Sequence, residues 1–100
     1  MASKPESLLR TKIANALRSV GAFVRVVHSD AHGAGALDLD VVYRGRAVKL
    51  EIKTPQNTEG MSKIQLNEQA AVRAAGGVAE ECRSVADALS ILELIEKGKL

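Results

Sequence analysis

The segment from Gly35 to Lys53 constrains the fold more than any other part of the chain. It contains two runs that alternate apolar and polar side chains, as half-buried strands do, and Arg44-Gly45 lies between them. Glycine accepts a positive φ at little cost, so this dipeptide is suited to a two-residue turn. The segment is therefore predicted to form a β-hairpin. Its apolar face comprises Leu37, Leu39, Val41, Tyr43, Val48, Leu50 and Ile52.

The turn also predicts which side chains face each other across the hairpin. Counting outward from a two-residue loop sets Asp40 opposite Lys49, which is an ordinary cross-strand ion pair. The same count sets Asp38 opposite Glu51, and like charges directly opposite each other destabilise a sheet. Two acids aimed at one point, with Lys53 on the same face, make sense if a divalent cation binds between the acids. A loop centred one residue later would instead set Asp38 against Lys53.

Length and composition limit the classes of protein that the chain can belong to. One hundred residues, of which 46% are hydrophobic and 26% charged, indicate one globular domain. A net charge of +2 permits nucleic-acid binding without requiring it. The only aromatic residues, Phe23 and Tyr43, argue against a base-stacking platform. The single cysteine, Cys82, excludes an internal disulfide and a cysteine-cluster zinc site, and we interpret it as a small buried residue.

No run of residues is long and apolar enough to cross a membrane, and the N-terminus lacks a secretory pattern. A cytoplasmic location is therefore expected, with no membrane partner.

Periodicity and end signals predict the remaining elements. Residues 3–20 form a helix with Ser3 at the N-cap, residues 22–28 form a strand, and residues 62–75 form a second helix. Residues 78–82 form a short strand at a sheet edge. A last helix follows Ser84 and buries Val85, Ala88, Leu89, Leu92 and Ile95. The order α-β-β-β-α-β-α predicts an α/β (α+β) fold in which helices flank a small mixed sheet.

Four polar residues outside the hairpin have both a structural and a functional interpretation. Glu6 follows Ser3 at the spacing of a capping box, and Gln65 stands in the same position at the start of the second helix. Either side chain can instead belong to a site. His28 and His32 lie in or beside a polar loop without a third partner, so solvent exposure is favoured over metal binding or proton transfer.

Together these motifs resemble those of the VRR-NUC (virus-type replication-repair nuclease) domain of the PD-(D/E)XK nuclease superfamily. The resemblance covers nearly the whole chain and implies one VRR-NUC-like nuclease domain over residues 1–100, with a restriction-endonuclease-like core. The chain departs from the family at Leu37, where proline is usual, but that position carries no chemistry. The matching motifs are Glu6, Gly35-Ala36-Leu37-Asp38, Glu51-Ile52-Lys53-Thr54-Pro55, Ser62 to Gln65, and Gly76-Gly77.

The resemblance implies a metal-dependent DNA endonuclease that hydrolyses phosphodiester bonds. Asp38 and Glu51 would bind Mg²⁺ or Mn²⁺ together with the backbone carbonyl of Ile52, and the ion would polarise the phosphodiester and acidify a bound water. Lys53 would orient or deprotonate the attacking water, or neutralise the transition state. Gln65 would orient the water or the scissile phosphate. Glu6 would complete the metal shell or hold a second ion.

Substrate and assembly are expected from size and family. A compact chain without a recognition element suits structure-specific cleavage, and stand-alone relatives resemble junction-resolving enzymes. Branched DNA such as a Holliday junction is therefore the expected substrate, and a homodimer would supply two active sites. A phage or bacterial origin is consistent with the family. Five basic residues are candidates for phosphate contacts: Arg25, Arg44, Arg46, Lys49 and Lys63.

Two alternative functions stay open. The first is a nuclease that cuts linear or single-stranded DNA without structural preference. The second is a non-catalytic nucleic-acid-binding module that kept the fold. The presence of Asp38, Glu51 and Lys53 together argues against the second, because a decayed site usually loses one of its members.

Overall fold

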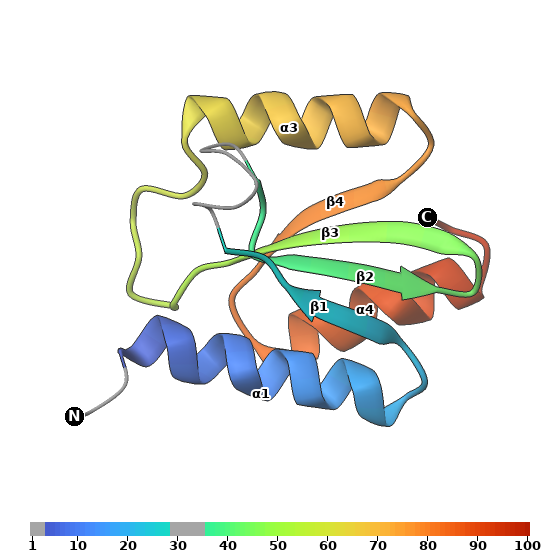
Figure 1. The fold of residues 1–100 in the computed structure, drawn as a ribbon, viewed down its shortest axis with the longest axis horizontal. Coiled ribbons are helices and arrows are strands. Elements are labelled where there is room, and N and C mark those ends of the chain that lie inside the picture. Colours follow the sequence, from blue (N-terminus) through green and yellow to red (C-terminus); the bar gives the residue numbers. More distant parts are fainter. Residues whose placement is uncertain (1–3, 29–35) are drawn as a thin grey trace.

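Residues 4–28 and 36–100 are described by the computed structural model, so Ser3, His32 and the predicted loop 29–35 lie outside the described residues. Within the described ranges the order α-β-β-β-α-β-α is confirmed (Figure 1). The elements are α1 (Pro5–Ser19), β1 (Phe23–Val26), β2 (Leu39–Tyr43), β3 (Arg46–Ile52), α3 (Lys63–Ala74), β4 (Val78–Cys82) and α4 (Val85–Glu96). No helix in these ranges has the length and hydropathy that a membrane crossing needs.

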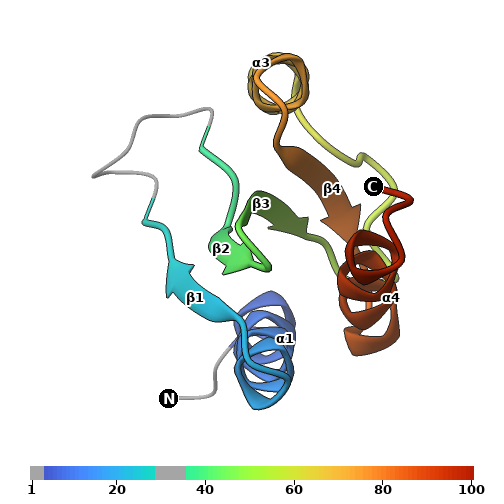
Figure 2. The same cartoon turned by 90° about the vertical axis from the view of Figure 1, so that its right-hand side faces the viewer.

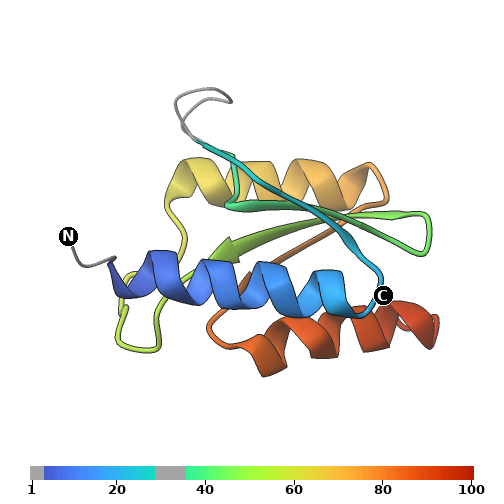
Figure 3. The ribbon, with the colours of Figure 1, turned by 60° about the horizontal axis from the view of Figure 1, so that its bottom comes forward.

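The four strands form one mixed sheet with the order β1-β2-β3-β4. The pairs β1/β2 and β2/β3 are antiparallel, whereas β3/β4 is parallel. The parallel pair requires a crossover, and α3 provides it by passing over one face of the sheet (Figure 1). Helices α1 and α4 pack against each other on the opposite face (Figures 2 and 3). The predicted edge position of the fourth strand is thereby confirmed.

The hairpin between β2 and β3 has the predicted turn and register. Arg44 and Gly45 both adopt positive φ angles, 51° and 77°, which match the right-handed twist of the flanking strands. Asp40 lies opposite Lys49, as the two-residue loop requires. The ladder ends with the pair of Leu39 and Leu50, one step before the predicted pair of acids.

The core lies between the sheet and the α1/α4 layer. Alternate residues of the hairpin point into it, which confirms the apolar face expected from the sequence. Cys82 is fully buried on β4, as predicted. Among the described residues, Glu51 is the one charged residue that is buried, with 3% of its surface exposed, and it points away from this core. The largest fully buried side chains are Ile13, Leu17, Leu39, Leu50, Ile52, Val41, Val48 and Cys82.

The N-termini of α1 and α3 differ in how they are capped. Helix α1 begins at Pro5, and its N-cap, Lys4, makes no side-chain capping bond. The N-cap is thus Lys4 and not the predicted Ser3, whereas the predicted bond between Glu6 and the Ser3 amide lies outside the described residues. The capping box of α3 is confirmed. The backbone amide of Gln65 donates to Ser62 Oγ, and the backbone amide of Ser62 donates to Gln65 Oε1.

Strand β1 is shorter than predicted. The strand covers Phe23–Val26, not residues 22–28, because β1 follows β2 only as far as the pair of Val26 and Leu39. One further bond, from the Val27 amide to the Asp38 carbonyl (2.8 Å), joins the two chains beyond the ladder. This bond fixes the backbone of Asp38 at the entry to β2.

Candidate functional site

Three carboxylates from distant parts of the chain meet at one end of the sheet. Glu6 comes from the first turn of α1, Asp38 from the residue before β2, and Glu51 from the end of β3. One oxygen from each lies within 4.8 Å of the others. Glu6 and Asp38 are partly exposed, whereas Glu51 is buried. The structure thus brings together the two predicted metal-binding acids and the helical acid.

Backbone amides hold the two strand acids in place. The Asp38 amide donates to Glu51 Oε1 (3.2 Å), and the Ile52 amide donates to Asp38 Oδ2 (2.8 Å). Each carboxylate is therefore bonded to the main chain beside the other carboxylate. These bonds offset part of the repulsion between the acids, and they orient the remaining oxygens toward a common point.

Lys53 and Gln65 both approach the second oxygen of Glu51. Lys53 Nζ lies 3.3 Å from Glu51 Oε2, and Gln65 Nε2 donates to the same oxygen at 2.9 Å. The Lys53 side chain is only 14% exposed. Gln65 combines the two roles that the sequence left open, since its Oε1 closes the capping box of α3 while its Nε2 reaches the site.

The electrostatics of Glu51 are unusual for a carboxyl group. Burial, followed by the nearby charge of Asp38, raises the pKa of Glu51 to about 7. The ammonium of Lys53 and the hydrogen bonds from Lys53 and Gln65 lower this pKa, but they do not offset the burial. A buried acid with a raised pKa in a cluster of acids is a feature of functional sites.

The donor set fits a hard divalent cation. All three side chains offer carboxylate oxygen, which suits Mg²⁺ and Mn²⁺ and disfavours metals that select nitrogen or sulfur. Glu51 is also buried at a cost that a cation between the acids would repay. The residues therefore form a candidate metal site. The Ile52 carbonyl as a further ligand stays a prediction.

Arg10 contacts the site but is not among the residues predicted from the sequence. Its Nη1 lies 3.5 Å from Asp38 Oδ1, and its Nη2 donates to Ser7 Oγ at 3.4 Å. A signal was present, because Arg10 follows Glu6 by four residues and side chains at that spacing share one face of a helix.

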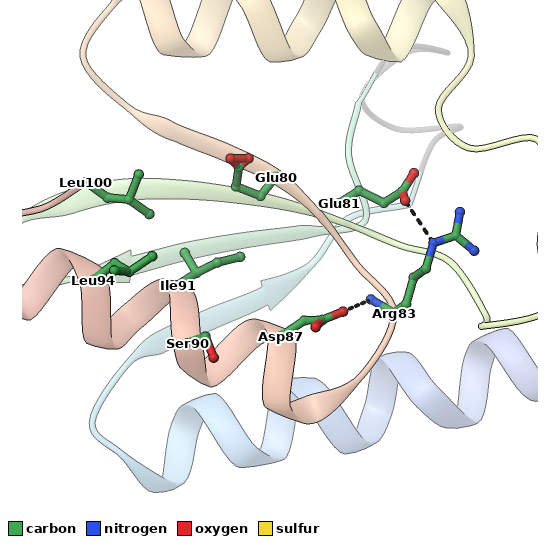
Figure 4. A pocket seen from close by; sticks show the side chains of 8 residues that line it. All are labelled: Glu80, Glu81, Arg83, Asp87, Ser90, Ile91, Leu94 and Leu100. Carbon is green, nitrogen blue, oxygen red and sulfur yellow. Dashed lines mark hydrogen bonds and ion pairs between the residues drawn. The ribbon is translucent and has the colours of Figure 1, made fainter.

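Arg83 was also missed, and no local pattern points to it. Its Nη1 donates to the backbone carbonyls of Thr54 (2.8 Å) and Asn57 (2.6 Å), in the loop that follows Lys53. Its Nε bonds Glu81 Oε2 at 3.0 Å (Figure 4). Arg83 thereby ties the loop after Lys53 to the end of β4.

The described residues also form a pocket beside β4 and α4, which none of the three clustered carboxylates lines (Figure 4). Its lining residues are Glu80, Glu81, Arg83, Asp87, Ser90, Ile91, Leu94 and Leu100.

Two of the five candidate DNA-contacting residues share the sheet face of the acids. Lys49 binds Asp40 at 2.7 Å, and Arg25 lies opposite Asp40 in the next strand. The guanidinium of Arg25 lies over the exposed ring of Phe23, 5.7 Å from its centroid. Lys63 is exposed at the start of α3, on the side of the sheet from which Gln65 reaches Glu51.

The other two candidates are not brought to the acids. Arg44 lies in the hairpin turn and Arg46 directly follows it, at the opposite end of β2 and β3. Arg44 pairs with Glu96 at 2.7 Å, and Arg46 donates to the carbonyl of Leu100. His28 is exposed just after β1.

Comparisons with known proteins give a fold but no sequence family. No protein-family model matches the sequence, and no curated protein sequence is a significant match. A solved structure titled "VRR_NUC domain" does match, with a TM-score of 0.72 and 25% sequence identity. The match covers 94% of this chain and 97% of the other. The resemblance inferred from the motifs is thus confirmed at the level of structure: the chain has the VRR-NUC fold, which is a PD-(D/E)XK nuclease fold.

Proposed function

We propose that this protein is a metal-dependent endonuclease that hydrolyses phosphodiester bonds in DNA. One observation carries the proposal: Glu6, Asp38 and Glu51 converge beside Lys53 at the end of a sheet with a nuclease fold. Each acid comes from a position at which the family has a motif residue. Clustered like charges with a buried member are costly unless they serve a ligand.

The carboxylates are the proposed metal-binding groups. Asp38 and Glu51 would hold Mg²⁺ or Mn²⁺, with Glu6 and the Ile52 carbonyl completing the protein ligands. A bound cation of this kind supplies Lewis-acid polarisation of the phosphodiester and makes a coordinated water more acidic. The protein contributes rigidity, because the amides of Asp38 and Ile52 fix both carboxylates before any ligand arrives.

Lys53 is the proposed electrostatic catalyst. Its ammonium is held beside Glu51 and is mostly shielded from solvent. A fixed positive charge with spare donors at this point would stabilise the negative charge that develops on the phosphate during hydrolysis. Gln65 is proposed to act as a positioning residue. Both ends of its amide already bind protein groups, one in the capping box and one on Glu51.

The proposed substrate is branched DNA such as a Holliday junction. Support comes from the fold, which matches a nuclease domain over nearly its whole length. It also comes from Arg25 and Lys49, which lie on the sheet face of the acids and could neutralise backbone phosphates without reading bases.

Cleavage of a panel of DNA substrates tests this function. The panel is a four-way junction, a flap, a splayed arm and a linear duplex, each with Mg²⁺, Mn²⁺ or EDTA. We expect paired nicks in the junction that are lost with EDTA and with Lys53→Ala, and that persist with Lys99→Ala, which removes an exposed lysine near the C-terminus. Equal cutting of every substrate would keep the nuclease and reject the junction preference. No cutting at all would favour the non-catalytic binding module.

A homodimer is the proposed active assembly, because a symmetric junction presents two strands to be cut. Sedimentation equilibrium at micromolar concentration is expected to give a mass of about twice the 10.6 kDa of one chain. A species that stays monomeric both alone and on junction DNA would contradict the dimer, and it would leave single-strand nicking as the remaining activity.

A further inference from the structure

Two basic side chains contact the candidate metal site within the described part of the chain, and only one of them belongs to a family motif. Lys53 pairs with Glu51, and Arg10 pairs with Asp38. Arg10 comes from α1, one helical turn after Glu6. Its side chain is about one quarter exposed, so the guanidinium lies at the mouth of the site and reaches solvent.

The contacts of Arg10 are loose. Its distances to Asp38 Oδ1 (3.5 Å) and Ser7 Oγ (3.4 Å) are both longer than a strong charge-assisted hydrogen bond, which spans about 2.7–2.9 Å. A guanidinium has five donors in a planar fork, and these two contacts use only two of them. Arg10 can therefore leave Asp38 by side-chain rotation, at the cost of one weak ion pair.

The charges at the site give this movement a consequence. Three carboxylates carry a formal charge of −3, and Lys53 and Arg10 offset two of these charges. The metal-free cluster thus keeps a formal charge of −1, whereas a cluster that holds a divalent cation is at +1. Without Arg10 the same loaded cluster would be neutral and would attract a phosphodiester less.

We propose that Arg10 is a phosphate-binding residue that pairs with Asp38 only while the metal site is empty. When Asp38 binds a divalent cation, Arg10 turns to a non-bridging oxygen of the DNA backbone beside the scissile bond. Arginine suits this second contact because its fork binds phosphate in a bidentate manner. The inference rests on the proposed nuclease function, and it adds a residue that competes with the metal and then holds the substrate.

The first test measures Mn²⁺ binding by calorimetry without DNA. Arg10→Gln removes the guanidinium that competes with the metal for Asp38. We therefore expect this variant to bind Mn²⁺ at least about 3-fold more tightly than the wild-type protein. The matched control is Lys12→Gln, which makes the same change of charge on an exposed position of the same helix and should leave the affinity unchanged. Thermal melts of both variants show that the fold is kept.

The second test measures junction binding by fluorescence anisotropy in Ca²⁺, at several salt concentrations and with gels to check for cleavage. We expect Arg10→Gln to bind DNA about 10-fold more weakly and to reduce the slope of log affinity against log salt by about 1. Arg10→Lys should restore the salt slope, because lysine keeps the charge, but only part of the affinity.

Tighter Mn²⁺ binding together with weaker DNA binding is the expected result, since loss of a merely structural residue would weaken both. Unchanged or weaker Mn²⁺ binding by Arg10→Gln, or unchanged DNA binding, would overturn the role of Arg10. A wild-type protein that binds no Mn²⁺ would instead overturn the proposed function itself.

Discussion

Asp38→Asn is expected to slow DNA cleavage about 1,000-fold or more. The substitution keeps the size of the side chain and one oxygen that can accept from the Ile52 amide, so the fold should survive. It removes the negative charge of a proposed metal ligand, and it places a side-chain amide group where Arg10 now meets a carboxylate oxygen. Single-turnover cleavage of junction DNA in Mn²⁺ is the measurement.

Asp40→Asn is the matched control for this loss. Asp40 is two residues away on the same sheet face, but it pairs with Lys49 and does not belong to the carboxylate cluster. It should keep most of the wild-type rate. Near wild-type cleavage by Asp38→Asn would show that the clustered acids do not drive the reaction, whatever the fold of the domain.

The metal-free domain is expected to be more stable near pH 5 than near pH 8, with Glu51 contributing about 2 kcal/mol of the difference. The pKa of Glu51 is about 7 in the folded protein against an ordinary value of 4.5. The folded state therefore holds this proton more tightly than the unfolded chain. The resulting stability is complete below pH 4.5 and is lost as the pH rises through 7.

Urea denaturation in EDTA at both pH values, for the wild-type protein and Glu51→Gln, measures this contribution. The variant has no carboxyl group at position 51 and keeps every other ionisable side chain, so the difference between the two proteins isolates Glu51. Mn²⁺ should restore stability to the wild-type protein near pH 8, because a ligand that binds only the folded state stabilises it. Identical pH dependence in both proteins would contradict a raised pKa of the buried Glu51 carboxyl group.

The hairpin is the part of the fold that the sequence predicts best. Its alternation is strict, and Arg44-Gly45 permits only a short turn, so the register follows by counting. Counting could not show that the ladder stops at Leu39 and Leu50. Beyond that pair, the Asp38 carboxylate turns to the Ile52 amide, an interaction that depends on local backbone direction and not on alternation.

The parts of the site that depend on long-range packing were not accessible from local pattern. Glu6 lies beside Asp38 because α1 packs on the sheet with its first turn at the end of β3. In the sequence alone, an acid at the start of a helix fits a capping role equally well. The spacing of Arg10 from Glu6 is visible in the sequence, but the contact of Arg10 with Asp38 depends on the same packing. Arg83 joins two segments 26 to 29 residues apart, and a single arginine after a strand carries no signal of such a contact.

NMR line broadening by Mn²⁺ tests the central claim, that the clustered carboxylates bind the metal, most directly. In the ¹⁵N-labelled wild-type protein, substoichiometric Mn²⁺ should broaden the amides of Asp38 and Ile52 first. The amide of Gly45 should stay sharp, since it lies seven residues along the hairpin, roughly 20 Å away. Broadening centred instead on the acids beside the pocket of β4 and α4, or no selective broadening, would contradict a metal site at Glu6, Asp38 and Glu51.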